Sequence, residues 1–87
     1  MYKVYITESA KKDLKKIDIY QAKLIIAWLR KNLEGCSDPR LYGKPLGYNR
    51  KGEWSYRVGS YRLIADIQDN VVTIEIISVG HRKNIYD

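Results

Sequence analysis

Basic side chains of a kind that binds phosphate groups gather in two short segments of the C-terminal half of the sequence. In the first segment, Arg57 and Arg62 stand on either side of a predicted tight turn at Gly59-Ser60. The second segment contains His81, Arg82, Lys83 and Tyr86. Paired guanidinium groups match the geometry of a phosphate group, and histidine is the side chain that ordinarily titrates near neutral pH. These residue types predict an anion-binding site at which a proton could also be transferred.

Residues 52–86 must position these side chains, and their pattern predicts three consecutive antiparallel strands. Gly59-Ser60 suits a two-residue type II′ loop, and Asp69-Asn70 suits a type I′ loop. Two such loops would place Arg57 opposite Arg62 and Ala65 opposite Ile74. Alternation supports this register because it collects the apolar side chains on one face. That predicted core face consists of Trp54, Tyr56, Val58, Tyr61, Leu63, Ala65, Ile67, Val72, Ile74 and Ile76.

The opposite face of the predicted sheet is polar and carries Arg57 and Arg62 as direct neighbours. Like charges placed opposite each other on a sheet are destabilising, so the pair indicates an anion site. The alternative is a solvated face on which each arginine contacts a nearby glutamate. In the same register Ser60 lies opposite Val79, so the segment that starts at His81 would emerge near Arg62.

The N-terminal half predicts a strand over residues 2–7, followed by two helices. Ser9 is the expected N-cap of a brief first helix. Asp18 is expected to cap a longer second helix, which Gly35 is placed to end. The apolar stripe of this helix consists of Ala22, Ile25, Ile26, Leu29 and Leu33. Leu24 and Trp28 widen the stripe, which indicates either a broad core contact or a ridge that binds a partner.

Residues 36–51 contain several prolines and glycines, which interrupt regular structure. The segment is also basic and aromatic, since it carries Arg40, Tyr42, Lys44, Tyr48, Arg50 and Lys51. It could line a groove for nucleic acid beside the two arginines. The alternative is an ordinary polar surface loop.

The composition is that of one small globular domain spanning residues 1–87, with 45% apolar and 30% charged residues. A net charge of +6 favours a polyanionic partner. Cys36 is the only cysteine and His81 the only histidine, which excludes a disulfide framework and leaves too few soft ligands for a structural zinc site. We therefore expect no metal and no cofactor. No segment has the pattern of a signal peptide or a membrane span, so the expected location is the cytoplasm.

Together these elements predict an α+β fold of order β-α-α-β-β-β, with two N-terminal helices packed on one face of a four-stranded, mostly antiparallel sheet. Three motifs within this layout resemble the RelE/ParE superfamily of bacterial toxin–antitoxin toxins. They are Gly43-Lys44-Pro45-Leu46, WSYRVGSYRLI at residues 54–64 and ISVGHRKNIY at residues 77–86. The last motif is more similar to the RelE branch than to the ParE branch, whose members inhibit DNA gyrase. The resemblance implies the RelE-like microbial RNase fold.

The RelE resemblance also implies a toxin that cleaves mRNA in the ribosomal A site without a metal, by attack of a ribose 2′-hydroxyl on the adjacent phosphate. Carried onto this sequence, it makes Arg62, Arg82 and Tyr86 catalytic, with His81 as a further catalytic candidate. The basic residues expected to bind RNA are Lys44, Arg50, Lys51, Arg57 and Lys83. The implied partners are the ribosome with its mRNA and a cognate antitoxin. The antitoxin would bind Leu24 and Trp28 and bring the complex to operator DNA.

This chain departs from the RelE pattern on the strand before the Tyr-Arg-Leu motif. Some members carry two lysines there, whereas this chain has Glu53 and Ser55. Lys44, Glu53 and His81 remain candidates for proton transfer. Two alternatives to an endoribonuclease stay open: a ParE-like inhibitor of DNA gyrase, and a weakened toxin that acts as a co-repressor with its antitoxin.

Overall fold

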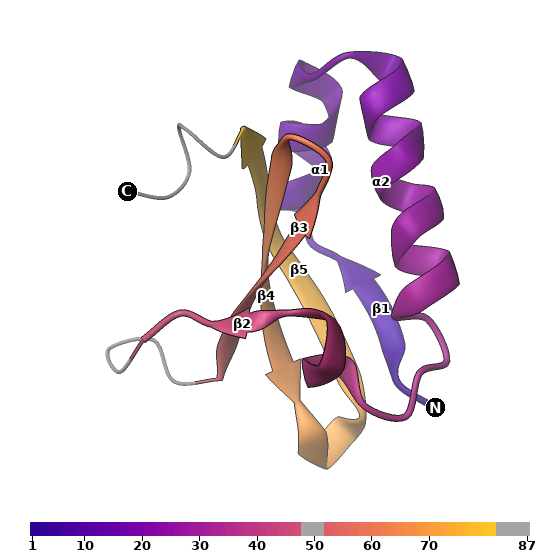
Figure 1. The fold of residues 1–87 in the computed structure, drawn as a ribbon, viewed down its shortest axis with the longest axis vertical. Coiled ribbons are helices and arrows are strands. Elements are labelled where there is room, and N and C mark those ends of the chain that lie inside the picture. The colour runs from indigo at the N-terminus through magenta and orange to yellow at the C-terminus, as the bar shows by residue number, and fades with distance from the viewer. Residues whose placement is uncertain (48–51, 82–87) are drawn as a thin grey trace.

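Two helices, two short 3₁₀ turns and a mixed sheet form the computed structural model, which describes residues 1–47 and 52–81 (Figure 1). In chain order the elements are β1 (Lys3–Ile6), α1 (Glu8–Lys16), α2 (Ile19–Asn32), η1 (Pro39–Tyr42), β2 (Lys44–Pro45), β3 (Glu53–Val58), β4 (Tyr61–Gln68), η2 (Asp69–Val71) and β5 (Thr73–His81). The sheet order is β1-β5-β4-β3-β2, with β1 parallel to β5 and the other neighbours antiparallel. The predicted α+β class is confirmed, but the sheet has five strands rather than four.

The additional strand is β2, in which Lys44 pairs with Ser55 and Pro45 with Trp54 at the edge of the sheet. Proline cannot donate a ladder hydrogen bond, so within sheets it is found at edges. Two residues are too few to show the alternation that marks a strand. The sequence pattern therefore indicated only an irregular segment here.

Both helices begin at side-chain caps. Thr7 Oγ1 accepts a hydrogen bond from Ala10 N at 3.2 Å and donates one to the Ile76 carbonyl at 2.7 Å. Thr7 rather than Ser9 therefore caps α1, and the prediction of Ser9 was wrong because Thr7 alone of the two also bonds to β5. Asp18 caps α2 as predicted, since its Oδ2 accepts from Tyr20 N at 3.1 Å. Neither helix is long and apolar enough to cross a membrane.

The hydrophobic core lies between the two helices and one face of the sheet (Figure 1). The helices contribute Ala10, Ile25 and Leu29, the C-cap of α2 contributes Leu33, and the strands contribute Tyr56, Leu63, Ala65, Ile74, Ile76 and Val79. Each large apolar side chain that is fully buried stabilises the fold by about 1.5–3 kcal/mol. Of the predicted stripe of α2, Ile25, Leu29 and Leu33 lie in this core, whereas Ala22 and Ile26 are only partly buried. The predicted core face of the strands is confirmed, except that Val72 is 39% exposed.

The first hairpin has the predicted register, with Arg57 opposite Arg62. The second does not. Residues 69–72 form a longer turn than the predicted two-residue loop, and Val72 takes a positive φ of 50°. A register irregularity between Ile64 and Ala65 shifts the pairing again. The longer turn alone places Ala65 opposite Ile76, so the predicted pairing of Ala65 with Ile74 was wrong, and the irregularity changes the pairing only from Ile64 back to Tyr61.

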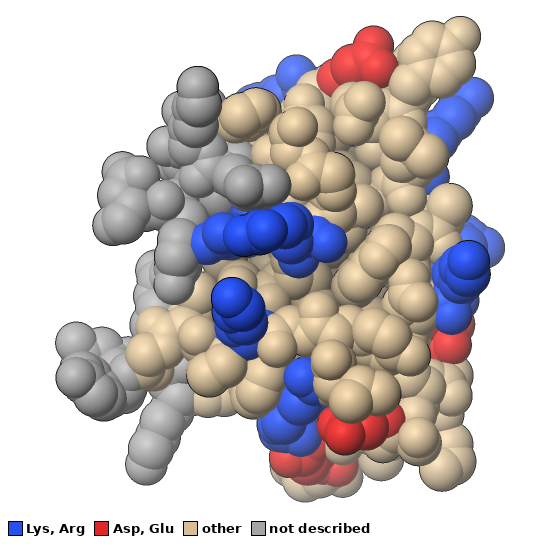
Figure 2. All heavy atoms as spheres, viewed as in Figure 1, with Lys and Arg blue, Asp and Glu red and all other residues tan. Residues whose placement is uncertain are grey.

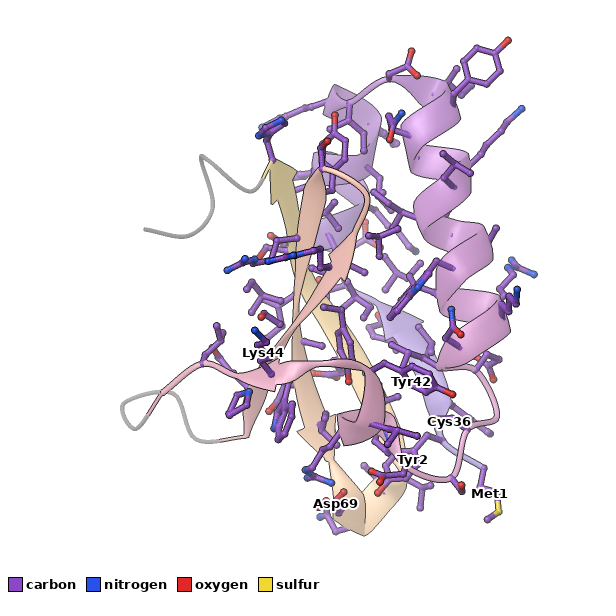
Figure 3. The ribbon with its side chains drawn as sticks, in the orientation of Figure 1. Met1, Tyr2, Cys36, Tyr42, Lys44 and Asp69 are labelled. Atoms are coloured by element: carbon purple, nitrogen blue, oxygen red, sulfur yellow. The ribbon has the colours of Figure 1, made fainter. Side chains whose placement is uncertain are left out.

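A cluster at the base of the molecule ties η1 to η2, to Tyr2 before β1 and to Trp54 of β3. Arg40 donates to Asp69 through both terminal nitrogens, at 3.2 and 2.8 Å, and Tyr2 Oη donates to the same carboxylate at 2.6 Å (Figure 3). The hydrogen bonds from Arg40, and then the one from Tyr2, hold the pKa of Asp69 below its usual value. The Arg40 guanidinium also lies 5.8 Å from the centre of the Trp54 ring. These contacts fix the start of the segment that leads into β2.

Candidate functional site

An open groove of about 510 Å³ lies where η1 and β2 meet the outer face of β3 and β4, the face turned away from the helices. Its basic wall consists of Lys44, Arg57 and Arg62, and its lining also includes Leu41, Tyr42 and Ser55. Figure 2 shows Lys and Arg side chains gathered on this side of the molecule. An anion that entered the groove would therefore meet positive charge and no carboxylate among its lining residues.

Strand pairing explains why these cations meet. Arg57 lies directly opposite Arg62 across the β3–β4 hairpin, and Lys44 lies opposite Ser55 on the other side of β3. Residues opposite each other share a face, and so do residues two apart on one strand. Lys44, Ser55, Arg57 and Arg62 therefore project from the same face. The structure brings together three of the residues that the sequence assigned to phosphate binding.

A close backbone approach at Gly43 holds β2 against β3. A Cβ atom at Gly43 would lie 2.7 Å from the Ser55 carbonyl oxygen and 2.8 Å from the Tyr56 ring, which is too close for any side chain. Tyr56 is fully buried, and its hydroxyl donates to the Pro39 carbonyl at 2.7 Å. Burial raises the pKa of the Tyr56 phenol, so the group stays a neutral donor. Glycine at this position thus sets Lys44 beside the arginine pair.

The outer face of the sheet carries opposite charge at its two ends. Glu53, Asp66 and Glu75 lie side by side across β3, β4 and β5. Gln68 Nε2 joins two of these carboxylates, donating to Asp66 at 3.0 Å and to Glu75 at 3.1 Å. Glu53 is about 13 Å from Arg57 along the strand. The resulting field directs an anionic ligand to the groove end of the sheet and away from the acidic end.

His81 lies on the other face of the sheet from Arg62. It pairs with Tyr61, whereas Arg62 pairs with Gly80, so alternation sends the two side chains to opposite faces. The His81 ring meets the Tyr61 ring edge-on, with 5.7 Å between their centres. The predicted position of Val79 opposite Ser60 was wrong, because the long second turn and the irregularity in β4–β5 place Val79 opposite Leu63. The structure thus does not join His81 to the arginine pair.

The other predicted catalytic and RNA-binding residues lie outside the described part of the chain. They are Arg50, Lys51, Arg82, Lys83 and Tyr86. Tyr48, the second aromatic residue of the basic loop, lies outside it as well. Their roles remain predictions from the sequence.

The two residues predicted to bind an antitoxin differ in their surroundings. Leu24 is 58% exposed on α2. Trp28 is half-buried against the core, with ring centres 5.7 Å from Tyr56 and 6.4 Å from Tyr42. Leu24 is free to contact another molecule without disturbing the core, whereas Trp28 contributes to packing.

The sequence predicted that the segment with Tyr42 could line a groove beside the arginines, and Tyr42 lines it, but Leu41 and the exposure of both side chains were missed. Leu41 is 71% exposed and Tyr42 is 45% exposed, although both are large apolar or aromatic residues. They belong to η1, whose position depends on bonds to distant residues such as the one between Arg40 and Asp69. The only sequence signal was the presence of Tyr42 among basic residues.

Comparison with known proteins gives a consistent relationship over almost the whole chain. Residues 4–86 match the family described as the ParE toxin of the type II toxin–antitoxin system parDE. The chain is 34% identical to Toxin RelG of Mycobacterium tuberculosis over 85 residues, which are 98% of this chain and 95% of RelG. It is 32% identical to Toxin RelE of the same organism, covering 98% of this chain and 86% of that toxin.

Solved structures agree with these relatives. The toxin–antitoxin complex RelBE2 from M. tuberculosis contains a chain that matches with a TM-score of 0.84 and 33% identity, covering 93% of this chain and 98% of that one. The isolated RelE toxin of E. coli matches with a TM-score of 0.71 at 23% identity, covering 93% of this chain and 84% of that one, and thus shares the fold. The family match, the two toxin relatives and the shared fold show that this chain belongs to the RelE/ParE superfamily of type II toxin–antitoxin toxins.

Proposed function

We propose that this toxin is a ribosome-dependent endoribonuclease that cleaves mRNA in the ribosomal A site. The observation that carries the proposal is the cross-strand pair Arg57 and Arg62, held with Lys44 in one open groove. Like charges placed directly opposite each other on a sheet repel, and a bound anion would offset that repulsion. Guanidinium groups bind phosphate with parallel hydrogen bonds. A phosphate of the RNA backbone is the ligand that this arrangement fits.

The proposed reaction is an internal transfer of the phosphoryl group. A ribose 2′-oxygen forms a bond to the adjacent phosphorus while the bond from phosphorus to the 5′-oxygen breaks. The products are a 2′,3′-cyclic phosphate and a 5′-hydroxyl, and the proton lost by the 2′-hydroxyl balances the one gained by the 5′-oxygen. Negative charge grows on the phosphoryl oxygens, where preorganised guanidinium groups stabilise it. Arg62 has this role, and Arg57 and Lys44 position the backbone.

The resemblance to the RelE branch supplies the rest of the proposed site. Arg82 would add a second catalytic guanidinium group, and Tyr86 would stack on a base or position the 2′-hydroxyl. Arg50, Lys51 and Lys83 would contact neighbouring phosphates. Charge stabilisation by these side chains would take the place of a metal ion in the transition state.

Proton transfer needs a group within reach of the phosphate bound at Arg62. Of the three candidates, Lys44 lines the groove, Glu53 belongs to the acidic end of the outer face, and His81 lies on the opposite face. The geometry favours Lys44, whose ammonium group could donate a proton to the departing 5′-oxygen.

We expect the substitution His81→Gln to leave the single-turnover cleavage rate and its pH profile close to wild type, because the imidazole points away from the groove. Lys44→Gln should slow cleavage by contrast. Rates on programmed ribosomes between pH 5.5 and 8.5 would test both. A general acid or base typically contributes about 10²- to 10⁴-fold. A loss of that size in His81→Gln, with a flattened pH limb, would place His81 in the mechanism.

A cognate antitoxin is the second proposed partner, by analogy with the RelBE2 toxin–antitoxin complex. The exposed ridge at Leu24 on α2 is the surface proposed to receive it, with Trp28 forming the base of the ridge. In the proposed system the antitoxin would also hold the complex on operator DNA.

Leu24→Ala should raise the dissociation constant for the antitoxin roughly tenfold, or about 1.4 kcal/mol. The fold should be little affected, because more than half of Leu24 is exposed. Calorimetric titration would measure the affinity, with Lys12→Ala on the exposed face of α1 as the control. Unchanged affinity in Leu24→Ala would show that the antitoxin binds elsewhere.

The match to the ParE family favours one competing function, the inhibition of DNA gyrase. Primer extension on cellular mRNA after brief induction of the toxin separates the two. Cuts at defined codon positions support the endoribonuclease. A DNA-damage response without cuts would support gyrase inhibition, and the absence of either effect would indicate the co-repressor.

A further inference from the structure

We propose that Tyr42 is a platform on which one nucleobase of the bound RNA stacks, next to the phosphate held by Arg57 and Arg62. The proposal rests on the proposed function and adds a base-binding subsite to the phosphate site. Its starting point is that Tyr42 and the two arginines line the same groove of about 510 Å³. A ligand with an anionic group and a flat face, such as a nucleotide, fits this lining.

The exposure of Tyr42 is not explained by packing. Its side chain is 45% exposed, and the preceding Leu41 is 71% exposed. Large side chains of this kind scattered singly on a surface need no explanation, but these two adjoin each other at the rim of a basic groove. Pro45 lines the same rim. The lining of the groove thus combines cationic side chains with apolar and aromatic ones.

Neighbouring rings hold Tyr42 in place. Trp28 meets the Tyr42 ring edge-on at 85°, with ring centres 6.4 Å apart, and Trp28 in turn contacts Tyr56 at 5.7 Å. Tyr56 is fully buried and bonded to Pro39. Figure 3 shows Tyr42 lying towards α2 and Lys44 over β2. A preorganised ring loses little side-chain freedom when a base stacks on it.

Stacking and phosphate binding have different signatures, which makes the proposal testable. An aromatic side chain stacks on an uncharged base and releases no counterions, so its contribution to single-stranded RNA affinity does not change the salt dependence. A cation in contact with phosphate contributes to the salt dependence, at about 0.7 in the logarithmic slope per contact. Loss of Tyr42 should therefore weaken binding without changing the slope, and loss of Lys44 should lower the slope.

The experiment measures binding of a short, fluorescently labelled single-stranded RNA to the full chain by anisotropy at several salt concentrations. Tyr42→Leu keeps apolar bulk against Trp28 but removes the aromatic face, and Tyr42→Phe keeps the face. Lys44→Ala is the control for phosphate contacts. Thermal denaturation of each variant checks that the fold is intact. The assay is repeated with RNAs that each lack one base, so that the effect of losing the Tyr42 ring can be compared with the effect of losing the base.

We expect Tyr42→Leu to bind roughly 5- to 100-fold more weakly than wild type with an unchanged salt slope, and Tyr42→Phe to bind like wild type. Removal of one particular base should weaken wild-type binding by a similar factor and leave Tyr42→Leu unaffected. The stacking platform would be overturned if Tyr42→Leu bound the RNA as tightly as wild type does. It would also be overturned if Tyr42→Leu lost as much affinity for the RNA that lacks the base as for the intact RNA. The proposed function would then survive as long as Lys44→Ala still lowers the slope. No binding of this RNA by the wild type would overturn the stacking platform, whereas the proposed function is tested separately by cleavage on programmed ribosomes.

Discussion

Replacing Arg62 with alanine should abolish growth inhibition while leaving the toxin folded. Arg62 lies opposite Arg57 in the groove, where it is proposed to stabilise the charge that develops during phosphoryl transfer. Loss of one such group typically costs about 10²- to 10³-fold in rate. The free energy of unfolding should stay within about 0.5 kcal/mol of wild type, because the change also relieves a like-charged pair.

Growth after induction, at protein levels matched by immunoblot, measures this effect. Arg30→Ala is the matched control, because Arg30 is an exposed arginine that lines a separate depression between α2 and β1. The control should remain fully toxic. Full toxicity of Arg62→Ala at wild-type protein level would show that the arginine pair is not needed for toxicity.

Gly43→Ala should lower the free energy of unfolding by roughly 1–3 kcal/mol, as overpacking of a close contact does. The added Cβ would meet the Ser55 carbonyl and the Tyr56 ring at under 3 Å, and neither can move freely, since one is strand backbone and the other is fully buried. The φ of Gly43 is −137°, so the expected loss comes from contact and not from backbone conformation.

Urea denaturation followed by tryptophan fluorescence measures the effect, since Trp28 lies against Tyr56. Ser37→Ala, at an exposed position of the preceding loop, should change stability by less than about 0.5 kcal/mol. Growth inhibition by Gly43→Ala should weaken as well, because β2 carries Lys44 into the groove. A variant as stable and as toxic as wild type would show that β2 does not depend on this contact.

Local patterns predicted the fold well wherever a short stretch of chain determines the structure. Alternation and the Gly59-Ser60 turn gave the Arg57–Arg62 pairing, which the structure confirms. The second turn was wrong because Asp69 is held by Arg40 and Tyr2 from distant segments, and that constraint is not visible in the local sequence. An error of this kind at a turn moves every partner along the strand.

The candidate site was likewise predicted in part from the sequence. Its basic wall follows from the register of one hairpin and could be predicted from the sequence. The placement of His81 could not, because it depends on the irregularity between Ile64 and Ala65, far from His81 in the chain. Tyr42 was missed as an exposed ring because η1 is positioned by long-range bonds and shows no periodicity. Long-range contacts thus decide which face each of these side chains occupies.

Cleavage of a defined mRNA on ribosomes programmed in vitro would measure the proposed endoribonuclease activity itself. Purified toxin should cut the message within the codon exposed in the A site, leaving a 2′,3′-cyclic phosphate on one product and a 5′-hydroxyl on the other. The same message without ribosomes should stay intact, and so should programmed ribosomes treated with Arg62→Ala. An uncut message on programmed ribosomes, together with inhibition of supercoiling by purified gyrase with the same toxin preparation, would contradict the account.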